Sequence, residues 1–353
     1  MQFSRRRLLA LPAAVALRSA PSPGAVNPAG AAPESPLAKP AALKPGDTVG
    51  LITPGTYVSD PDKLALVKRT VEYFGLKPKF GRNVGKRAGY LGGSDQERLD
   101  DLHAMFRDPE VKAVFCIRGG FGSAHLVDRI DYELIAGHPK VFLGFSDITA
   151  LHLAIHKRTG LVTFYGPVMT SAFTEFTQAW FRRAMFDPQP LGAVGNPQEL
   201  NPLRPKHVIR TVRPGRARGR LVGGNLTLFC GLMGTPFEPE TRGRILFLED
   251  VDEQPYSIDR MLTQLRLAGK FDGVAGVIWG ECLDCKPRDY KPSFESTFST
   301  GEVVDQILGR LKVPVLSGLT IGHTDDQLTL PLGVMASLDA DRGELVIEET
   351  ATV

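Results

Sequence analysis

The chain has 353 residues, of which 42% are hydrophobic and 23% are charged, close to the average for a globular protein. This composition excludes disordered, collagen-like and disulfide-scaffold proteins, and the length predicts two domains, since one core serves roughly 100 to 200 residues. The net charge of +3 includes five basic and one acidic residue before Leu43; the other 37 basic and 38 acidic residues balance at −1, which argues against a nucleic-acid partner.

The excess of basic residues near the start belongs to a predicted export signal. Residues 5–7 are three arginines, and the apolar run 8–17 that follows is too short to cross a bilayer core of about 30 Å. The arginine pair directly after Ser4 resembles a twin-arginine signal, which directs export of folded proteins to the periplasm. The alternatives are an ordinary secretory signal and an N-terminal helix. Residues 20–40 are mostly Ala, Pro, Ser and Gly, so residues 1–42 are predicted to be a signal and linker, with the cleavage site open.

The first part of the body alternates strands with helices. Helices are predicted to begin at Asp60, which precedes a proline, and at Ser94, which forms a capping box with Glu97. Strands are predicted at 48–53, 111–117 and 141–143. This alternation predicts a parallel sheet with helices on both faces.

A proline-rich stretch over 187–219, with six prolines, predicts a domain boundary. The predicted units are a first domain over 43–190, a linker over 191–218 and a second domain over 219–353. The second domain is predicted to contain more antiparallel pairing than the first. Its predicted elements are strands at 243–248 and 274–279, a helix from Ser257 to Gly269, and a hairpin over 336–348.

Ser146 lies where the strand 141–143 gives way at once to a helix over 148–155. Such a turn lifts a side chain clear of the sheet to the positive end of a helix, where backbone N–H groups can receive an oxyanion. Ser146 is therefore a candidate nucleophile, and helix capping by Ser146 or Asp147 is the alternative. Ile148 stands where the G-x-S-x-G motif has its second glycine, so an α/β-hydrolase is not implied.

A glycine-rich loop, residues 118–122, follows another strand of the same predicted sheet. Glycines allow backbone N–H groups to approach a ligand closely, so this loop is a candidate half of an oxyanion hole, with Arg118 near an anionic group of the substrate. His125 stands where a dinucleotide-binding fingerprint requires its third glycine, which disfavours a nucleotide cofactor. A tight turn without a ligand is the alternative.

The histidines differ in their surroundings. His323 follows a predicted strand within a glycine-rich loop, where catalytic groups often lie. His152 and His156 lack the glutamate of a zinc-protease helix and are predicted to lie on a helix surface. The remaining histidines stand alone and are predicted to be structural: His103, His125, His138 and His207.

Four carboxylates follow the strand 243–248 at once: Glu249, Asp250, Asp252 and Glu253. They can form a solvated loop, a metal site, or a group that orients a histidine as the acid of a triad does. Cys282 and Cys285 are three residues apart, which leaves a disulfide open, and Cys116 and Cys230 are predicted to be buried thiols.

Seven short motifs, taken in order and spacing, resemble the LD-carboxypeptidases. These are serine peptidases of murein that include the muramoyltetrapeptide carboxypeptidases and the microcin C immunity hydrolases. The resemblance covers roughly Leu43 to Glu348. The motifs are VGLITP (49–54), RGGFGS (118–123), GFSDITAL (144–151), GGNL (223–226), LFLEDV (246–251), PYSIDRML (255–262) and GH (322–323).

The resemblance implies an α/β fold: a Rossmann-like N-terminal domain with a parallel sheet, and a C-terminal mixed α/β domain that is β-barrel-like. It implies that Ser146 is the nucleophile, Glu249 the orienting acid and His323 the general base. The implied oxyanion hole consists of the backbone N–H group of Asp147 and that of Gly119 or its neighbour Gly120.

The implied reaction is release of the terminal D-Ala from murein tetrapeptides through an acyl-enzyme, without a metal or cofactor. Arg118 is the predicted partner of the terminal carboxylate. The alternatives are a microcin-type hydrolase of aminoacyl-nucleotide conjugates and a non-catalytic protein that binds peptidoglycan stems. An export signal favours a wall substrate, no stable membrane insertion is expected, and a homodimer is left open.

Overall fold

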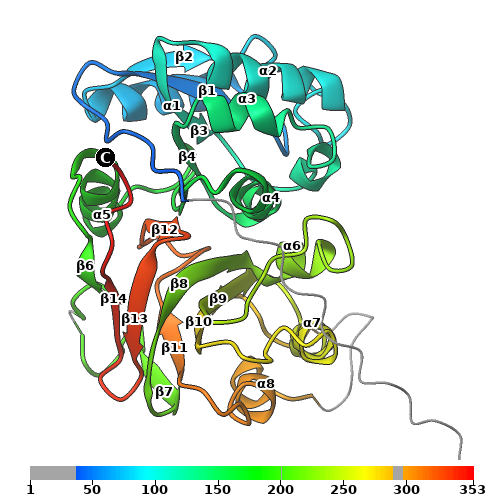
Figure 1. Cartoon of the computed structure of the whole chain (residues 1–353), viewed down its shortest axis with the longest axis vertical. Coiled ribbons are helices and arrows are strands. Elements are labelled where there is room, and N and C mark those ends of the chain that lie inside the picture. The colour runs from blue at the N-terminus through cyan, green and yellow to red at the C-terminus, as the bar shows by residue number, and fades with distance from the viewer. Residues whose placement is uncertain (1–36, 200, 289–296) are drawn as a thin grey trace, which may run out of the picture. The chain divides into compact units, whose positions relative to one another are not determined.

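The computed structural model describes residues 37–199, 201–288 and 297–353, which belong to one unit containing two sheets (Figure 1). The predicted export signal and most of the predicted linker fall at residues 1–36, outside the described residues. The last part of that linker pairs with the body, because Ala38 forms a parallel bridge with Leu161. Within the described ranges, none of the helices combines the length and the apolar character needed to cross a membrane.

The first sheet has six strands in the order β12-β5-β4-β3-β1-β2. Their bounds are β1 Thr48–Ile52, β2 Lys77–Phe80, β3 Val111–Cys116, β4 Val141–Gly144, β5 Thr163–Tyr165 and β12 Leu330–Leu332. The first five pair in parallel, as predicted, and β12 adds an antiparallel edge from near the end of the chain. Strand β12 therefore joins a sheet that otherwise comes from the first half of the sequence.

Helices cover both faces of this sheet, as the side-chain alternation of β3 indicates. Val114 and Cys116 pack in one apolar core with helix α2 (Asp95–Arg107), whereas Ala113 and Phe115 pack in another with α1 (Pro61–Tyr73). Successive strand residues point to opposite faces, so a strand buried on both sides reads as a continuous apolar run. The remaining helices of this half are α3 Tyr132–Gly137, α4 Thr149–Thr159 and α5 Glu175–Phe186.

The second sheet has eight strands in the order β6-β14-β13-β8-β9-β10-β11-β7. Their bounds are β6 Gly192–Val194, β7 Arg210–Arg213, β8 Arg216–Asn225, β9 Arg244–Val251, β10 Gly276–Leu283, β11 Val315–Leu319, β13 Met335–Asp339 and β14 Glu344–Ile347. The four strands β8 to β11 pair in parallel and the outer pairs are antiparallel, which confirms the mixed pairing. Its helices are α6 Leu226–Gly231, α7 Pro255–Leu267 and α8 Thr300–Ile307.

The barrel-like form expected for the second half is not observed, because the strand pairing leaves the sheet open. Among the described strands, β6 and β7 each pair with one neighbour and form the two edges of an open sheet. Both edge strands come from residues 191–218, the segment predicted to be a linker. Proline cannot donate to a strand ladder, so a proline-rich segment is suited to short edge strands. The division into domains at these boundaries stays a prediction.

The predicted starts of α1 and α2 are confirmed, whereas α4, predicted over 148–155, runs from Thr149 to Thr159. Asp60 caps α1 through its side chain, and Ser94 forms the complete capping box with Glu97 at α2. Helix α7 begins at Pro255 rather than at Ser257, because proline is well suited to the first turn, where its missing N–H costs nothing.

Candidate active site

Ser146 occupies the turn between β4 and α4 in a strained backbone conformation. Its φ angle is 64°, in the left-handed region that residues other than glycine rarely adopt. Neither the short 3-10 turn Ser146–Ile148 nor α4 receives a side-chain capping bond, so the capping alternative for Ser146 and Asp147 does not apply. The predicted strand-to-helix turn is therefore present, and it presents the hydroxyl rather than using it as a cap.

A hydrogen-bonded chain joins Ser146, His323 and Glu249. His323 Nε2 lies 2.9 Å from Ser146 Oγ, and His323 Nδ1 lies 2.8 Å from Glu249 Oε2. A carboxylate can only accept, so Nδ1–H donates to Glu249 and Nε2 is left to accept from the serine hydroxyl. The three residues come from the β4–α4 turn, from β9 and from the loop after β11, and we call them the Ser–His–Glu chain.

Tyr165 forms hydrogen bonds with two members of the Ser–His–Glu chain. Its hydroxyl donates to Glu249 Oε1 at 2.6 Å and accepts from the backbone N–H of Ser146 at 3.2 Å. Burial, with the nearby Glu249 charge, raises the pKa of Tyr165 well above its usual value, so the phenol keeps its proton. Sequence reasoning missed this residue, because a tyrosine at the end of a buried strand reads as part of the core.

Gly322 has no side chain, which leaves room for the Glu249 carboxylate beside His323. Its φ angle is +96°, and a Cβ added there would lie 2.0 Å from Glu249 Oε2. The residue before His323 must therefore be glycine on both conformational and steric grounds.

Opposing effects act on the pKa of the His323 imidazole. Burial lowers the pKa of His323, but the charge and the hydrogen bond of Glu249, together with the charge of Asp250, outweigh it and raise the pKa overall. Glu249 is fully buried, whereas His323 keeps 17% of its side chain exposed. The site therefore stabilises an imidazolium while leaving it open to a ligand.

The first two of the four carboxylates, Glu249 and Asp250, have different hydrogen-bond partners. Glu249 faces His323, whereas Asp250 accepts hydrogen bonds from Asn225 Nδ2 at 2.9 Å and from Thr227 Oγ1 at 2.8 Å. Burial and the neighbouring Glu249 raise the pKa of Asp250 to about 6. In the described part of the chain, no three His, Cys, Asp or Glu side chains are grouped to hold a metal ion.

The glycine-rich loop lies against the serine. A Cβ added at Gly119 would be 3.1 Å from Ser146 Cβ and 3.4 Å from the backbone nitrogen of Asp147. The buried Asp147 carboxylate ties the loop down by accepting from the N–H groups of Gly122 and Ser123 at 3.1 and 2.9 Å. Within the described residues the N–H groups of Gly119 and Gly120 donate no hydrogen bond, so they are available to a ligand.

Arg118 lies at the end of β3 beside this loop. Its side chain is exposed and makes no hydrogen bond or ion pair with any described residue. The structure thus leaves the guanidinium free, and its predicted role stays a prediction.

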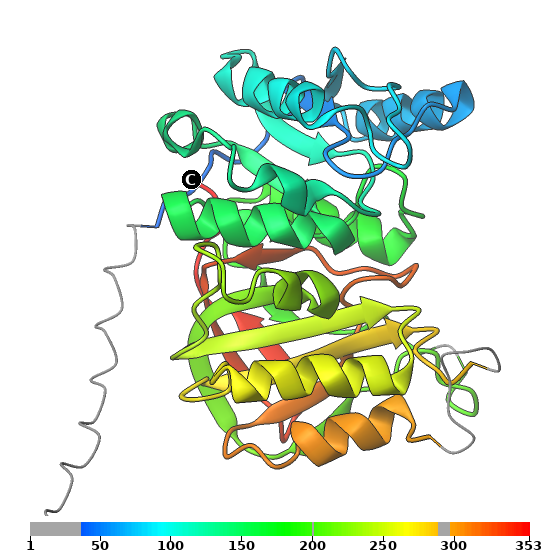
Figure 2. The same cartoon turned by 90° about the vertical axis from the view of Figure 1, so that its right-hand side faces the viewer.

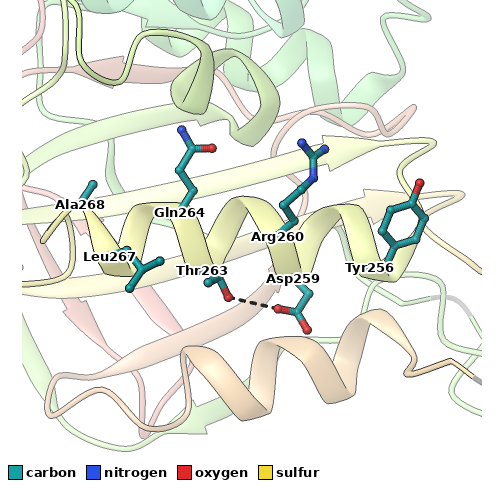
Figure 3. Close-up of a pocket in the computed structure, with 7 residues that line it drawn as sticks. All are labelled: Tyr256, Asp259, Arg260, Thr263, Gln264, Leu267 and Ala268. Atoms are coloured by element: carbon teal, nitrogen blue, oxygen red, sulfur yellow. Dashed lines mark hydrogen bonds between the residues drawn. The ribbon is translucent and has the colours of Figure 1, made fainter.

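A cavity of about 440 Å³ is lined mainly by residues of β10, β11 and α8. Its lining includes Thr324, the residue after His323, and Gly280, whose position is packed against Glu249. A second hollow of about 690 Å³ lies along α7 between Tyr256 and Ala268 (Figure 3). Ser146, His323 and Glu249 line neither hollow, and only the smaller one includes a residue of the His323 loop, Thr324.

Two side predictions have different outcomes. His152 is fully buried rather than on a helix surface, because α4 packs against both β5 and β8 and is exposed only near its end, at Lys157 and Arg158. Its Nε2–H donates to the Gly144 carbonyl at 2.8 Å, and burial lowers the pKa of His152 to about 4. Cys282 and Cys285 form the disulfide that the sequence left open, and the prediction that Cys116 and Cys230 are buried thiols is confirmed.

Both halves of the chain match the same peptidase family. Residues 49–166 match the N-terminal domain of LD-carboxypeptidases, and residues 218–338 match the C-terminal domain. The chain belongs to the LD-carboxypeptidase family. The predicted family and the prediction that the protein is a serine-type hydrolase are thereby confirmed.

Three relatives illustrate the range of this family. The "Probable murein peptide carboxypeptidase" of Bacillus subtilis is 42% identical over 88% of this chain and 94% of its own. The crystal structure of muramoyltetrapeptide carboxypeptidase from Oxalobacter formigenes has a TM-score of 0.74 at 31% identity, covering 86% of this chain and 100% of that one. The microcin C7 self-immunity protein MccF of Escherichia coli is 32% identical over 89% of this chain and 96% of its own, and an MccF structure has a TM-score of 0.79.

Proposed function

We propose that this protein is a serine LD-carboxypeptidase that releases the terminal D-Ala from murein tetrapeptides. The observation that carries the proposal is the continuous hydrogen-bonded chain from Ser146 Oγ through His323 to the buried Glu249. Relatives that are named murein peptide carboxypeptidases support the substrate class.

In the first step His323 acts as the general base. Nε2 takes the Ser146 proton while Oγ attacks the carbonyl carbon of the L-configured centre that precedes D-Ala. The negative charge that develops on the carbonyl oxygen is received by backbone N–H groups of Asp147 and of Gly119 or Gly120. Glu249 holds the imidazole in the required tautomer and stabilises the imidazolium as it forms.

In the second step the imidazolium returns its proton to the amine of D-Ala, the C–N bond breaks, and the peptide stays on Ser146 as an ester. Water then enters and gives its proton to Nε2 as its oxygen attacks the ester carbonyl. The proton passes to Ser146 Oγ as the ester bond breaks, which regenerates the enzyme and frees a shortened peptide acid.

Recognition of a chain terminus requires a cation for its carboxylate, and we assign this to Arg118. Its guanidinium is exposed, beside the glycine-rich loop, and without a partner among the described residues. A planar guanidinium can bind a carboxylate through two parallel hydrogen bonds.

The deciding experiment is mass spectrometry of products from purified tri-, tetra- and pentapeptide stems. We expect D-Ala release from the tetrapeptide, and loss of release by about a thousandfold or more in Ser146→Ala. Ser337→Ala is the matched control, since Ser337 lies on β13 in the second sheet. Undiminished release by Ser146→Ala would refute the role of the serine, and hydrolysis of an aminoacyl sulfamoyl nucleoside without tetrapeptide cleavage would favour the microcin-type function.

We also propose that the protein is exported through a twin-arginine signal and acts in the periplasm. The support is the sequence of residues 5–7 and the apolar run after them. Fractionation of cells that make the variant Arg5→Lys/Arg6→Lys tests it. Retention of that variant in the cytoplasm is expected, and unchanged export would refute this route.

A further inference from the structure

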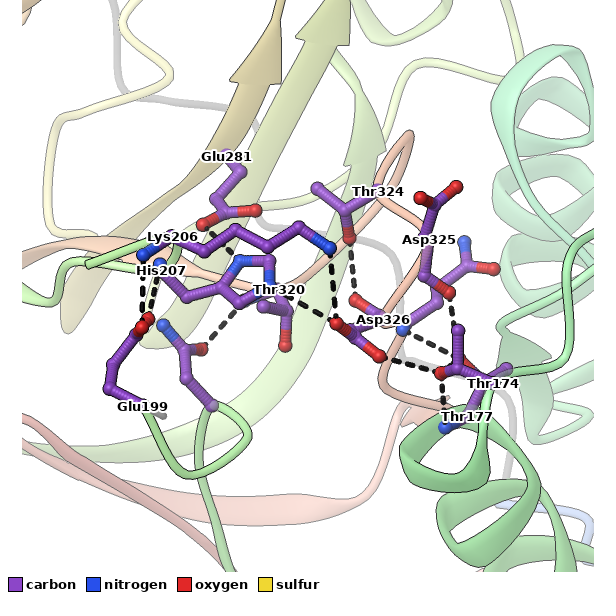
Figure 4. Close-up of polar contacts among 12 residues, drawn as sticks. Thr174, Thr177, Glu199, Lys206, His207, Glu281, Thr320, Thr324, Asp325 and Asp326 are labelled. Atoms are coloured by element: carbon purple, nitrogen blue, oxygen red, sulfur yellow. Dashed lines mark hydrogen bonds and ion pairs between the residues drawn. The ribbon is translucent and has the colours of Figure 1, made fainter. Parts of the chain in front are cut away.

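The loop that carries His323 is fastened by a second histidine, His207 (Figure 4). The side chain of His207 is only 4% exposed, and both of its ring nitrogens face carboxylates. Nδ1 lies 2.8 Å from Glu281 Oε1, and Nε2 lies 3.2 Å from Asp326 Oδ2. Asp326 comes three residues after His323, so a contact to it acts directly on the loop.

The partners of His207 come from separate parts of the fold. Glu281 lies on β10, while His207 itself lies just before the edge strand β7. Asp326 also accepts from Thr174 Oγ1 at 2.6 Å, and Thr174 caps helix α5 of the first half. The loop is therefore tied both to the second sheet and to a helix of the first half through one aspartate.

Two further side-chain bonds of the loop are internal or run to α5. Gln327 Nε2 donates to the Gly322 carbonyl at 2.7 Å, and Thr177 Oγ1 donates to the Asp325 carbonyl at 3.0 Å. Neither bond reaches β10. Apart from the His323–Glu249 bond, whose alignment is in question, the described side chains of the loop reach the second sheet through Asp326, by way of His207 and Glu281.

The ring of His207 lies among acidic side chains and separates two of them. Glu199, Glu281 and Asp326 surround it, and besides the ring the set contains one cation, Lys206, whose Nζ lies 3.4 Å from Asp326 Oδ2. Both carboxylates that face the ring nitrogens keep only 18% of their side chains exposed. Removal of the ring would leave these carboxylates close together without a donor between them, which favours their separation.

We propose that His207 is a positioning residue for the reaction: by joining Asp326 to Glu281 it holds the loop so that His323 stays aligned between Ser146 and Glu249. The inference rests on the proposed function only for its kinetic readout. The loop geometry itself can be measured on the protein without a substrate.

The first test is amide hydrogen exchange of residues 320–328 in His207→Ala and in the wild type. We expect exchange in this segment to become about tenfold faster, because the loop loses its tie to β10. His103→Ala is the matched control, since His103 is a half-buried histidine of α2 whose ring accepts one hydrogen bond, from the Asp131 N–H. Unchanged exchange in His207→Ala would overturn the inference whatever the substrate proves to be.

The second test is the steady-state release of D-Ala. A positioning role predicts a fall in kcat of about tenfold with KM within about twofold, because the substrate still binds while His323 is misaligned. His207→Gln, which keeps a donor for one carboxylate, is expected to recover part of kcat, and it serves alone if His207→Ala does not fold. Equal loss in the Ala and Gln variants, or a change confined to KM, would overturn the inference, whereas a wild type without D-Ala release would refute the proposed function and leave the exchange test standing.

Discussion

At the scale of single residues, the site depends on a few buried polar groups that lack a sequence motif. Tyr165 is fully buried and bonds to both Glu249 and the Ser146 N–H, yet it reads as a core residue in the sequence. Ser146, His323 and a run of four carboxylates are candidates because each follows a predicted strand, and the family resemblance selects Glu249 from that run. The groups that support them could not be found, since support is given by contacts between distant segments.

Tyr165→Phe should lower kcat by about tenfold and change KM little. The substitution removes one hydrogen bond to the buried Glu249 carboxylate, worth about 1.5 to 3 kcal/mol for a charged acceptor. Tyr132→Phe is the control, because its half-buried hydroxyl donates to the Val127 carbonyl away from the chain. Equal kcat in the two variants would contradict a role for Tyr165 in orienting Glu249.

The pH dependence of kcat/KM should report His323. The base must be neutral, and Glu249 raises the pKa of His323, so activity rises as pH increases through that raised pKa. Glu249→Gln removes the charge, and we expect the acid limb of the profile to move to lower pH while kcat falls at every pH. Glu348→Gln, which removes a surface carboxylate paired with Arg218, should leave the limb in place. An acid limb that stays unmoved in Glu249→Gln would show that another group controls it.

At the scale of elements, the loops at strand ends carry the site, and local rules predict where they begin. The capping residues of α1 and α2 and the turn at Ser146 follow from short-range chemistry and are present. The edge strands β6 and β7 were missed, because their pairing depends on partners far along the chain rather than on their own composition.

Gly322→Ala tests the packing of the loop against Glu249. The added Cβ would meet Glu249 Oε2 at 2.0 Å, so we expect kcat to fall by about a hundredfold or more. Gly85→Ala is the matched control: its φ of +93° is close to the +96° of Gly322, but a Cβ there meets nothing within 4 Å. Both variants bear similar backbone strain, so the difference in kcat measures the contact alone, and equal losses would contradict its importance.

At the scale of the molecule, the two sheets share their apolar cores. One core contains both Val114 of β3 and Leu246 of β9, and the other contains both Phe115 and Phe247. Strand β12 adds to this sharing, because it belongs to the first sheet while its sequence neighbours build the second (Figures 1 and 2). Such shared cores favour unfolding as one cooperative unit.

Single-tryptophan variants can test this cooperativity. Trp180 lies in α5 and Trp279 in β10, so Trp279→Phe leaves a probe in the first half and Trp180→Phe leaves one in the second. Within each variant, we expect urea unfolding followed by fluorescence to coincide with unfolding followed by far-UV circular dichroism. A separation of about 1 M or more between the two midpoints would indicate halves that unfold independently.

The sequence by itself determined the family, the alternation of strands and helices, and the three residues of the Ser–His–Glu chain, because these depend on local patterns and short motifs. Only the tertiary structure decided that the second sheet stays open and that β12 crosses to the first. It also decided that Tyr165 and His207 lie where they can hold Glu249 and the His323 loop. The physical reason is that polar contacts between distant residues, such as His207 and Asp326, which are 119 positions apart, leave no local pattern, since burial and pairing exist only once the chain has folded.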